Sequence, residues 1–346
     1  MIWPLSLAVI ACSSFVLTWL TKRYGERRRM LDIPNERSSH TRSIVRGGGL
    51  SFVVTFLVGL PLFLWLDVIP LAVVVALSGA GVLVAVVGFV DDHHHVSAKY
   101  RFVVHGLAAG WALYWLAGVP AVVLGQMGVT APSFLADVVA FLYIVWLLNL
   151  YNFMDGIDGI AGVEVITAGF GGALLYLQVM PAGMVWVLPA SLSAAAAGFL
   201  CWNLPPARIF MGDVGSGFLG VTFAVLSLHS ALLSPVLFWA WMILLGVFVV
   251  DATFTLLVRL ARGQRFYEAH RTHAYQHAGR EHGHRRVTLS VAIINLIWLL
   301  PLAWAVASGL LSGPWGLLMA YLPLVWLANY WRAGRDAGGR GLKMAS

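Results

Sequence analysis

Long apolar runs separated by short polar segments make up most of this sequence of 346 residues. A bilayer core about 30 Å thick is crossed by roughly 20 apolar residues in a helix. Eleven runs approach that length, and they cover residues 3–21, 48–66, 70–90, 102–119, 134–150, 160–179, 182–202, 217–233, 235–258, 287–308 and 311–330. The pattern predicts an all-α integral membrane protein, a polytopic bundle of about eleven transmembrane helices.

Composition supports the same class. Hydrophobic residues make up 60% of the chain and charged residues 11%, whereas soluble domains average about 25% charged residues. Cys12 and Cys201 lack C-x-x-C spacing, so neither a disulfide framework nor a thiolate metal site is expected. No internal repeat or soluble domain is visible. We therefore expect residues 1–346 to form a single transmembrane domain, in which residues 331–346 are a basic tail.

The basic residues indicate the topology of the bundle. Segments 22–47, 91–101, 151–159, 203–216, 259–286 and 331–346 hold all 22 Lys and Arg residues, and the intervening connections hold none. By the positive-inside rule these segments are cytoplasmic, with the N-terminus outside and the C-terminus inside. Basic residues follow the first run instead of preceding it, which predicts an uncleaved membrane helix. The net charge of +7 reflects this sidedness, so no nucleic-acid partner is expected.

Most histidines and acids lie in the same polar segments. Asp91 and Asp92 directly follow the third run. Two adjacent carboxylates at a low-dielectric boundary favour a divalent cation, a basic partner or a raised pKa, and the alternative is an ordinary polar helix end. Residues 93–95 are all histidines. Because neighbouring side chains on a helix point about 100° apart, we expect a structural or solvated triplet and no zinc site.

A second polar cluster follows the fifth run. Its members recur every three residues, which would align them on one side of a helix: Asn149, Asn152, Asp155 and Asp158. Gly156 and Gly159 favour a broken helix or a loop. The cluster offers hard oxygen ligands. A glycine-rich connecting turn is the alternative, and it accounts for the glycines but not for the row of polar residues.

A third cluster lies between the seventh and eighth runs. Asp213 and Ser216 occupy a glycine-rich helix start, with Asn203 and Arg208 upstream. Free N–H groups at such a start suit a phosphate, and a carboxylate there can hold the Mg²⁺ of that phosphate.

The ninth run and the loop after it carry the last group of charges. Asp251 lies inside the apolar pattern, either in a direct role or as a partner for an Arg or a neighbouring helix. The loop contains several Arg residues together with His270, Arg271, His273 and His277. Cations and imidazoles fit an anionic diphosphate. A general basic patch at the membrane surface would explain the Arg residues but not the histidine spacing.

These motifs, in this order, resemble the polyprenyl-phosphate N-acetylhexosamine-1-phosphate transferase family, whose relatives include phospho-N-acetylmuramoyl-pentapeptide transferase. The similarity runs from D-I-P-N-E-R-S-S-H-T-R-S-I-V-R-G-G-G at 32–49 to the histidine loop near 277. It implies transfer of a sugar 1-phosphate from a UDP-N-acetylhexosamine, or a deoxy derivative, to undecaprenyl phosphate. UMP is released, Mg²⁺ is required, and Mn²⁺ is an alternative ion.

The resemblance also implies roles for individual residues. Asp91, Asp92 and His273 match catalytic positions, and Asp213 and Asp155 match metal ligands. Substrate-binding roles fall on Asn152, Asp158, Asn203, Lys99, Arg265, Arg271 and His270. Tyr275 and Gln276 replace the usual histidine run after His273. This departure is similar to the branch that handles deoxy sugars, and it makes a muramoyl-pentapeptide substrate less expected.

The family further implies an active site that faces the cytoplasm in the bacterial cytoplasmic membrane. It also implies that the product initiates O-antigen, lipopolysaccharide or a related envelope glycan. A homodimer is compatible with the family. Two other classes stay open. A transporter would use Asp251, His105 and His229 as a polar pathway, although no inverted repeat is visible. A metal-binding scaffold would use the histidines.

The proposed chemistry needs no strong base. A phosphate monoester is already mostly dianionic at neutral pH. We therefore expect Asp91 and Asp92 to position a phosphate or a metal, with proton abstraction by Asp91 as the secondary hypothesis.

Overall fold

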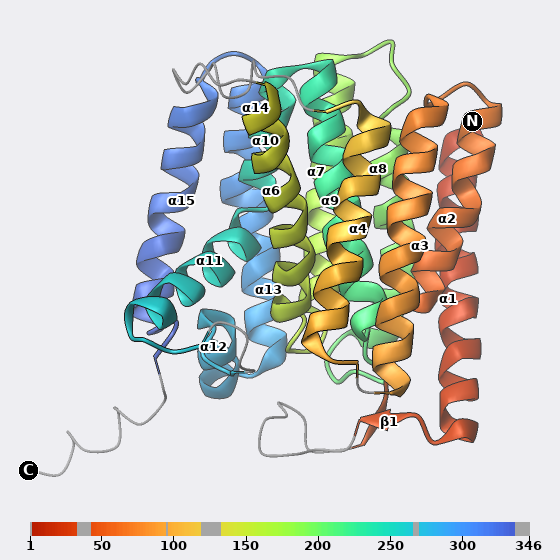
Figure 1. Ribbon diagram of the computed structural model, residues 1–346, viewed down its shortest axis with the longest axis vertical. Coiled ribbons are helices and arrows are strands. Elements are labelled where there is room, and N and C mark those ends of the chain that lie inside the picture. Colours follow the sequence, from red (N-terminus) through yellow and green to blue (C-terminus); the bar gives the residue numbers. More distant parts are fainter. Residues whose placement is uncertain (1, 33–42, 95, 119–132, 266–269, 336–346) are drawn as a thin grey trace, which may run out of the picture.

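The computed structural model describes residues 2–32, 43–94, 96–118, 133–265 and 270–335. Most helices run side by side along one axis and form a bundle (Figure 1). The first half contains α1 (Ile2–Arg28), α2 (Leu50–Trp65), α3 (Leu71–His93), α4 (Ala98–Leu116), α6 (Ser133–Met154), α7 (Ile160–Val179) and α8 (Val187–Asn203). Strands β1 (Leu31–Asp32) and β2 (Ile44–Val45) form a short antiparallel hairpin between α1 and α2.

The second half begins with α9 (Asp213–Leu233), the most deeply buried helix. It continues with α10 (Pro235–Leu244), α11 (Gly246–Ala261), α12 (Ala274–His282), α13 (His284–Ile293), the π-helix η1 (Ile294–Leu299), α14 (Leu300–Ala307) and α15 (Gly313–Tyr330). Only the first five residues of the predicted basic tail, 331–335, belong to the described part of the chain.

Helix length and composition bear out the membrane class. Within the described residues, six spans are long and apolar enough to cross a bilayer: Trp3–Arg28, Leu71–His93, Phe134–Met154, Ile160–Val179, Asp213–Leu233 and His284–Ala307. The pair α10 and α11 would be a seventh, and α2 and α8 are shorter apolar helices. The other two predicted runs, 102–119 and 311–330, are largely helical as α4 and α15. The count of eleven crossings therefore stays a prediction.

The ninth predicted run is not one continuous helix. The sequence pattern predicts a helix over 235–258, but the chain bends by 69° at Leu245 between α10 and α11. Gly246 begins the second half, and a Cβ there would lie 3.2 Å from the ring of Tyr321 on α15. The missing side chain lets α15 pack closely at the bend. As a result, α11 runs obliquely to the other helices (Figure 1).

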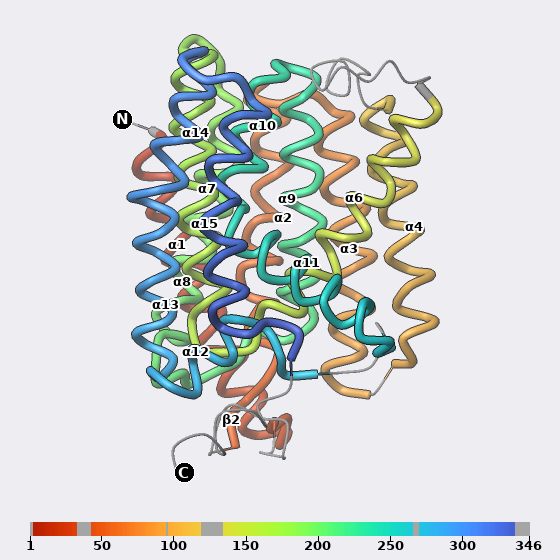
Figure 2. The backbone as a smooth tube through the Cα atoms, turned by 90° about the vertical axis from the view of Figure 1, so that its left-hand side faces the viewer, coloured from red at the N-terminus to blue at the C-terminus, as the bar shows by residue number. Residues whose placement is uncertain are grey.

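Close backbone contacts bring α2, α3 and α9 together at one end of the bundle. A Cβ on Gly88 of α3 would lie 2.5 Å from the carbonyl carbon of Asp213, and a Cβ on Gly49 would lie 2.4 Å from Cα of Gly215. Any larger residue would force these backbones apart. The tube in Figure 2 shows α9 inside the bundle, with α12 and the β hairpin at the lower end. The N-terminus lies toward the opposite end (Figure 1).

Candidate active site

Asp92 binds the start of α9. Gly212, with a φ of 77°, turns the chain into this helix, and a Cβ there would lie 2.4 Å from Asp92 Oδ2. Asp92 Oδ1 accepts the N–H of Asp213 at 2.9 Å, and Oδ2 accepts the N–H of Val214 at 3.2 Å. These donors have no partner inside the helix, and the helix dipole favours a negative charge here. Asp92 therefore positions the turn that carries Asp213.

Two arginines join the carboxylates at this end of the bundle. Arg46 Nε lies 2.8 Å from Asp92 Oδ1, and Arg46 Nη2 lies 2.5 Å from Asp213 Oδ1. Arg101 Nη1 lies 2.7 Å from Asp91 Oδ2 and 3.0 Å from Asp213 Oδ2. We call Arg46, Asp91, Asp92, Arg101 and Asp213 the carboxylate–arginine cluster. Burial lowers the pKa of Arg46, but the charges of Asp213 and Asp92 outweigh this and raise it above its ordinary value.

The loop before α2 brings Arg46 to the cluster. Phe210 donates its N–H to the carbonyl of Val45 at 2.8 Å, and Gly48 donates to the carbonyl of Phe210 at 2.8 Å. Residues 45–49 therefore run alongside residues 209–211, one turn before Asp213. Asp91 is fixed in a similar way, since its Oδ1 accepts the N–H of Val96 at 2.7 Å.

The predicted row of polar residues after α6 divides into two groups. Asn152 lies in the last turn of α6 and donates to Ser216 Oγ at 3.2 Å, which places it beside the first turn of α9. Asp155 follows the helix end. Burial raises the pKa of Asp155 well above its ordinary value, and Arg46 partly opposes this. Among the described residues, no hydrogen bond or ion pair reaches the Asp155 carboxylate. Its oxygens are therefore free to take a ligand.

Asp158 and Asn203 join two loops. Asp158 Oδ2 accepts the N–H of Ala207 at 3.0 Å, and its Oδ1 lies 3.2 Å from His284 Nδ1. Asn203 is 2% exposed; its Oδ1 accepts the N–H of Gly159 at 3.0 Å and its Nδ2 donates to the carbonyl of Ile209 at 2.9 Å. Both side chains bind protein groups, so their predicted contacts with substrate stay a prediction.

His273 is the N-cap of α12 and lies beside a buried acid. Asp251 Oδ1 accepts the N–H of Ala274 at 3.0 Å, and Oδ2 accepts the N–H of Tyr275 at 2.9 Å. His273 is buried, with its Nδ1 3.4 Å from Asp251 Oδ1. Asp251 is thus a partner for the end of a neighbouring helix, which is one of the two roles that the sequence left open.

Tyr275 connects this turn to the Asp155 loop. Its hydroxyl donates to the carbonyl of Phe153 at 2.8 Å, and a Cβ on Gly156 would lie only 2.2 Å from that hydroxyl oxygen. Burial raises the pKa of Tyr275 well above its ordinary value, so the hydroxyl remains a donor. The structure therefore brings the His273 turn next to Asp155.

The remaining predicted residues lie around the same end. The ring of His270 stacks on that of His273, with 4.9 Å between centroids. Burial lowers the pKa of His270 to about 3, helped by the charges of His273 and Arg259. Lys99 and Arg265 are exposed, and Arg271 is half-buried.

Sequence reasoning did not select Arg46 and Arg101 as site residues. Each is a basic residue next to a predicted apolar run, a position that the positive-inside rule explains without any further role. The motif I-V-R-G-G-G does contain Arg46, and its glycines were a signal of close backbone packing.

The donor set fits a divalent cation held together with a phosphate. Asp155 and Asp213 offer hard oxygens, which Mg²⁺ prefers. In the part of the chain that the structure describes, no three His, Cys, Asp or Glu side chains form a complete metal site. Mg²⁺ is usually bound by one or two carboxylates plus substrate phosphates, and not by an all-protein cage. Two carboxylates without a complete set of protein ligands match this mode of Mg²⁺ binding.

The fold and the site together define a helical membrane protein with a cluster of carboxylates and arginines at one end of the bundle. Residues 74–231 match the model of glycosyl transferase family 4. A probable undecaprenyl-phosphate N-acetylglucosaminyl 1-phosphate transferase of Bacillus subtilis is 28% identical over 82% of this chain and 79% of its own length.

Two further relatives agree. A decaprenyl-phosphate N-acetylglucosaminephosphotransferase of Mycobacterium tuberculosis is 26% identical, covering 89% of this chain and 83% of the relative. A phospho-N-acetylmuramoyl-pentapeptide-transferase of Chloroflexus aurantiacus is 28% identical, covering 72% and 73%. The family match and these relatives agree with the resemblance that the sequence motifs predicted.

Proposed function

We propose that this protein transfers an N-acetylhexosamine 1-phosphate, or a deoxy derivative of it, from a UDP-sugar to undecaprenyl phosphate. The products are undecaprenyl-diphospho-sugar and UMP. The observation that carries this proposal is the carboxylate–arginine cluster at the start of α9. There Asp213 contacts both Arg46 and Arg101, and Asp155 keeps open oxygens nearby.

The reaction joins two anions. An oxygen of the lipid phosphate attacks the phosphorus that bears the sugar, a new P–O–P bond forms, and the bond to the UMP oxygen breaks. Because the barrier is largely electrostatic, preorganised positive charge is the main requirement. Arg46 and Arg101 are held by carboxylates and are available to phosphate oxygens with their remaining N–H groups.

Charge balance supports a divalent cofactor. Asp91, Asp92, Asp155 and Asp213 contribute four negative charges when ionised, and Arg46 and Arg101 contribute two positive charges. The deficit is two charges, which one Mg²⁺ or Mn²⁺ neutralises. Asp155 and Asp213 would hold the ion, which polarises the phosphoryl oxygens when it is bound.

Asp91 fits a positioning role better than that of a base. One of its oxygens accepts the Val96 N–H and the other contacts Arg101. A carboxylate engaged at both oxygens is poorly placed to take a proton, and a dianionic lipid phosphate has none that must be removed. Asp91 would then orient Arg101 toward the phosphate.

The biological setting follows from this reaction. We propose a cytoplasmic-facing site in the bacterial cytoplasmic membrane, where the product initiates O-antigen, lipopolysaccharide or a related envelope glycan. A homodimer is compatible with the proposal. The alternative sugar donor is a UDP-N-acetylmuramoyl-pentapeptide, because the Chloroflexus relative is a phospho-N-acetylmuramoyl-pentapeptide-transferase. The test therefore includes this donor.

The experiment measures UMP release by the purified full chain in detergent with undecaprenyl phosphate, Mg²⁺ and a panel of UDP-sugars. The panel includes UDP-N-acetylglucosamine, UDP-N-acetylgalactosamine, deoxy derivatives and UDP-N-acetylmuramoyl-pentapeptide. EDTA and Asp213→Ala should each abolish release. Asp67→Asn, an exposed acid in the loop between α2 and α3, is the matched control and should retain it. A folded sample that releases no UMP from any donor would overturn the proposal.

A further inference from the structure

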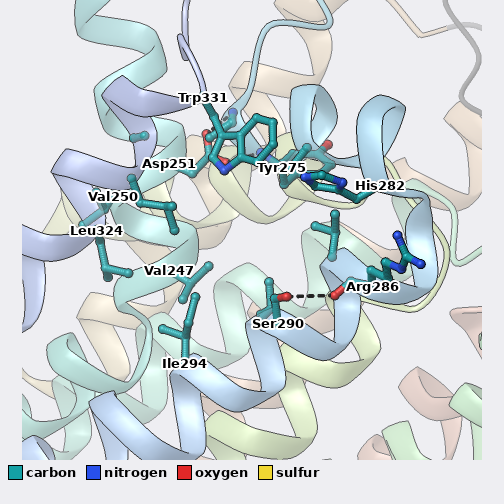
Figure 3. A pocket seen from close by; sticks show the side chains of 16 residues that line it. Val247, Val250, Asp251, Tyr275, His282, Arg286, Ser290, Ile294, Leu324 and Trp331 are labelled. Atoms are coloured by element: carbon teal, nitrogen blue, oxygen red, sulfur yellow. Dashed lines mark hydrogen bonds between the residues drawn. The ribbon is translucent and has the colours of Figure 1, made fainter.

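A cavity of about 400 Å³ lies between α11, α12, α13 and α15 (Figure 3). Apolar side chains make up most of its wall, including Val250, Val287, Ile294 and Leu324. None of the residues of the carboxylate–arginine cluster lines it. Figure 1 places α12, α13 and α15 away from α3 and α4, which carry Asp91, Asp92 and Arg101.

The polar groups Asp251 and Ser290 in the cavity wall already have hydrogen-bond partners within the protein. Asp251 contributes to the lining, but its carboxylate accepts the N–H groups of Ala274 and Tyr275 and the hydroxyl of Thr255 at 3.1 Å. Ser290 also lines the cavity, and its hydroxyl donates to the carbonyl of Arg286 at 2.9 Å (Figure 3). With these groups satisfied, the interior suits a hydrocarbon chain.

Aromatic and basic side chains complete the lining. The rings of His282 and Trp331 meet edge to face with centroids 5.4 Å apart. Arg286 is exposed, and among the described residues no carboxylate pairs with its guanidinium. Trp and Arg are typical of the level at which lipid head groups meet protein.

The outer surfaces of the same helices are apolar and exposed. Ile293 and Ile297 on α13 and η1, and Leu322 and Trp326 on α15, are all exposed large hydrophobic residues. In a membrane protein such surfaces face the bilayer, because lipid is the only solvent in which they are stable. A membrane lipid is therefore the molecule that reaches this cavity most directly.

We propose that the cavity binds one acyl chain of an anionic membrane phospholipid, whose phosphate pairs with Arg286. The unpaired guanidinium supplies the charge complementarity, and the apolar wall accommodates the chain. The polyprenyl substrate is a different occupant, because its phosphate must reach Arg46 and Arg101 for the reaction proposed above. This lipid site goes beyond the proposed function, and only the exclusion of the polyprenyl substrate from the cavity rests on that function.

The test measures lipid binding to the delipidated full chain in detergent by native mass spectrometry. Phosphatidylglycerol is compared with phosphatidylcholine of the same acyl chains and with undecaprenyl phosphate. We expect phosphatidylglycerol to bind about fivefold more tightly than phosphatidylcholine, the gain typical of one basic residue near an anionic head group. Arg286→Gln should remove this preference.

Two matched controls separate the cavity from a general basic surface. Arg285→Gln removes the neighbouring exposed charge outside the cavity and should leave the preference intact. Ala278→Leu fills the cavity and should weaken the binding of both phospholipids. Leu289→Phe, on the exposed surface, should leave their binding unchanged. If Ala278→Leu fails to fold, the surface substitution Arg286→Gln still decides the matter.

Three results would overturn the proposal. One is equal binding of the two phospholipids. Another is an equal effect of Arg285→Gln and Arg286→Gln, which would mean a diffuse basic patch. The third is displacement of phosphatidylglycerol by undecaprenyl phosphate with the same dependence on Arg286, which would assign the cavity to the polyprenyl chain.

Discussion

The carboxylate of Asp92 holds the backbone of Asp213. Its two oxygens accept consecutive N–H groups of the first turn of α9, and its side chain is fully buried. Asp213, by contrast, is 14% exposed at its side chain and makes its ion pairs with two partly exposed arginines. The two acids therefore differ in role: Asp92 anchors the turn, whereas Asp213 pairs with both arginines, where the proposed function places the reacting groups.

This difference predicts that replacing Asp92 mainly lowers stability, whereas replacing Asp213 mainly lowers activity. Asp92→Asn should lower the free energy of unfolding by about 1–3 kcal/mol, because it leaves a buried N–H without its acceptor. Asp213→Asn should cost less stability but reduce UMP release about a hundredfold or more. Unfolding in detergent and UMP release would be measured on both variants. Equal losses of stability would contradict the assignment.

Arg46 should not tolerate replacement by lysine. Its Nε and Nη2 contact two different carboxylates, which the planar guanidinium achieves and a single ammonium does not. We expect Arg46→Lys to reduce UMP release at least about tenfold, a loss equal to one 1.4 kcal/mol interaction in the transition state. Arg285→Lys, at an exposed position, serves as the control. Full activity of Arg46→Lys would show that only its charge matters.

Asn203 needs both halves of its amide. The side chain accepts from Gly159 and donates to the carbonyl of Ile209. Asn203→Asp keeps the acceptor but turns a carboxylate toward that carbonyl, so we expect a loss of about 1–3 kcal/mol in unfolding free energy. Asn329→Asp, on the exposed end of α15, should have little effect. An unaltered unfolding curve for Asn203→Asp would argue against this bridge.

The pKa of His270 predicts an acid-sensitive fold. In the folded protein burial lowers this pKa to about 3, whereas the unfolded chain binds the proton near pH 6.5. Between these values the unfolded state holds more protons, so stability falls as the pH drops below about 6.5. The apparent unfolding temperature of the wild type should decline from pH 7.5 to 4.5, and His270→Gln should decline less. Parallel curves would exclude His270 as the source.

Much of the fold followed from apolar periodicity alone. Each of the eleven runs is helical over most of its length, because an apolar run in a membrane can satisfy its backbone only as a helix. The bend at Leu245 was not predicted. Gly246 lies inside an unbroken apolar run, and its close contact with Tyr321 of α15 is a tertiary contact that local sequence does not reveal.

The candidate site was predicted in part for a related reason. Its acids could be selected from the sequence, because carboxylates beside apolar runs are unusual. Arg46 could not be selected, because it pairs with Asp213 at a separation of 167 residues and only the folded chain brings them together. The contacts of Asp158 and Asn203 with protein groups could not be predicted either, because they form only where two loops meet in the folded chain.

The order of the cluster along the chain has a consequence for biogenesis. Arg46, Asp91, Asp92 and Arg101 all lie in or beside the first four helices, and the pairs Arg46–Asp92 and Arg101–Asp91 are balanced in charge. In a nascent chain that emerges from its N-terminus, these two pairs can therefore form before α9 is made. Asp213 arrives only with α9 and shares both arginines, which gives the centre its negative charge. If the proposed function holds, affinity for a cation is acquired late, after the membrane scaffold around the site has been assembled.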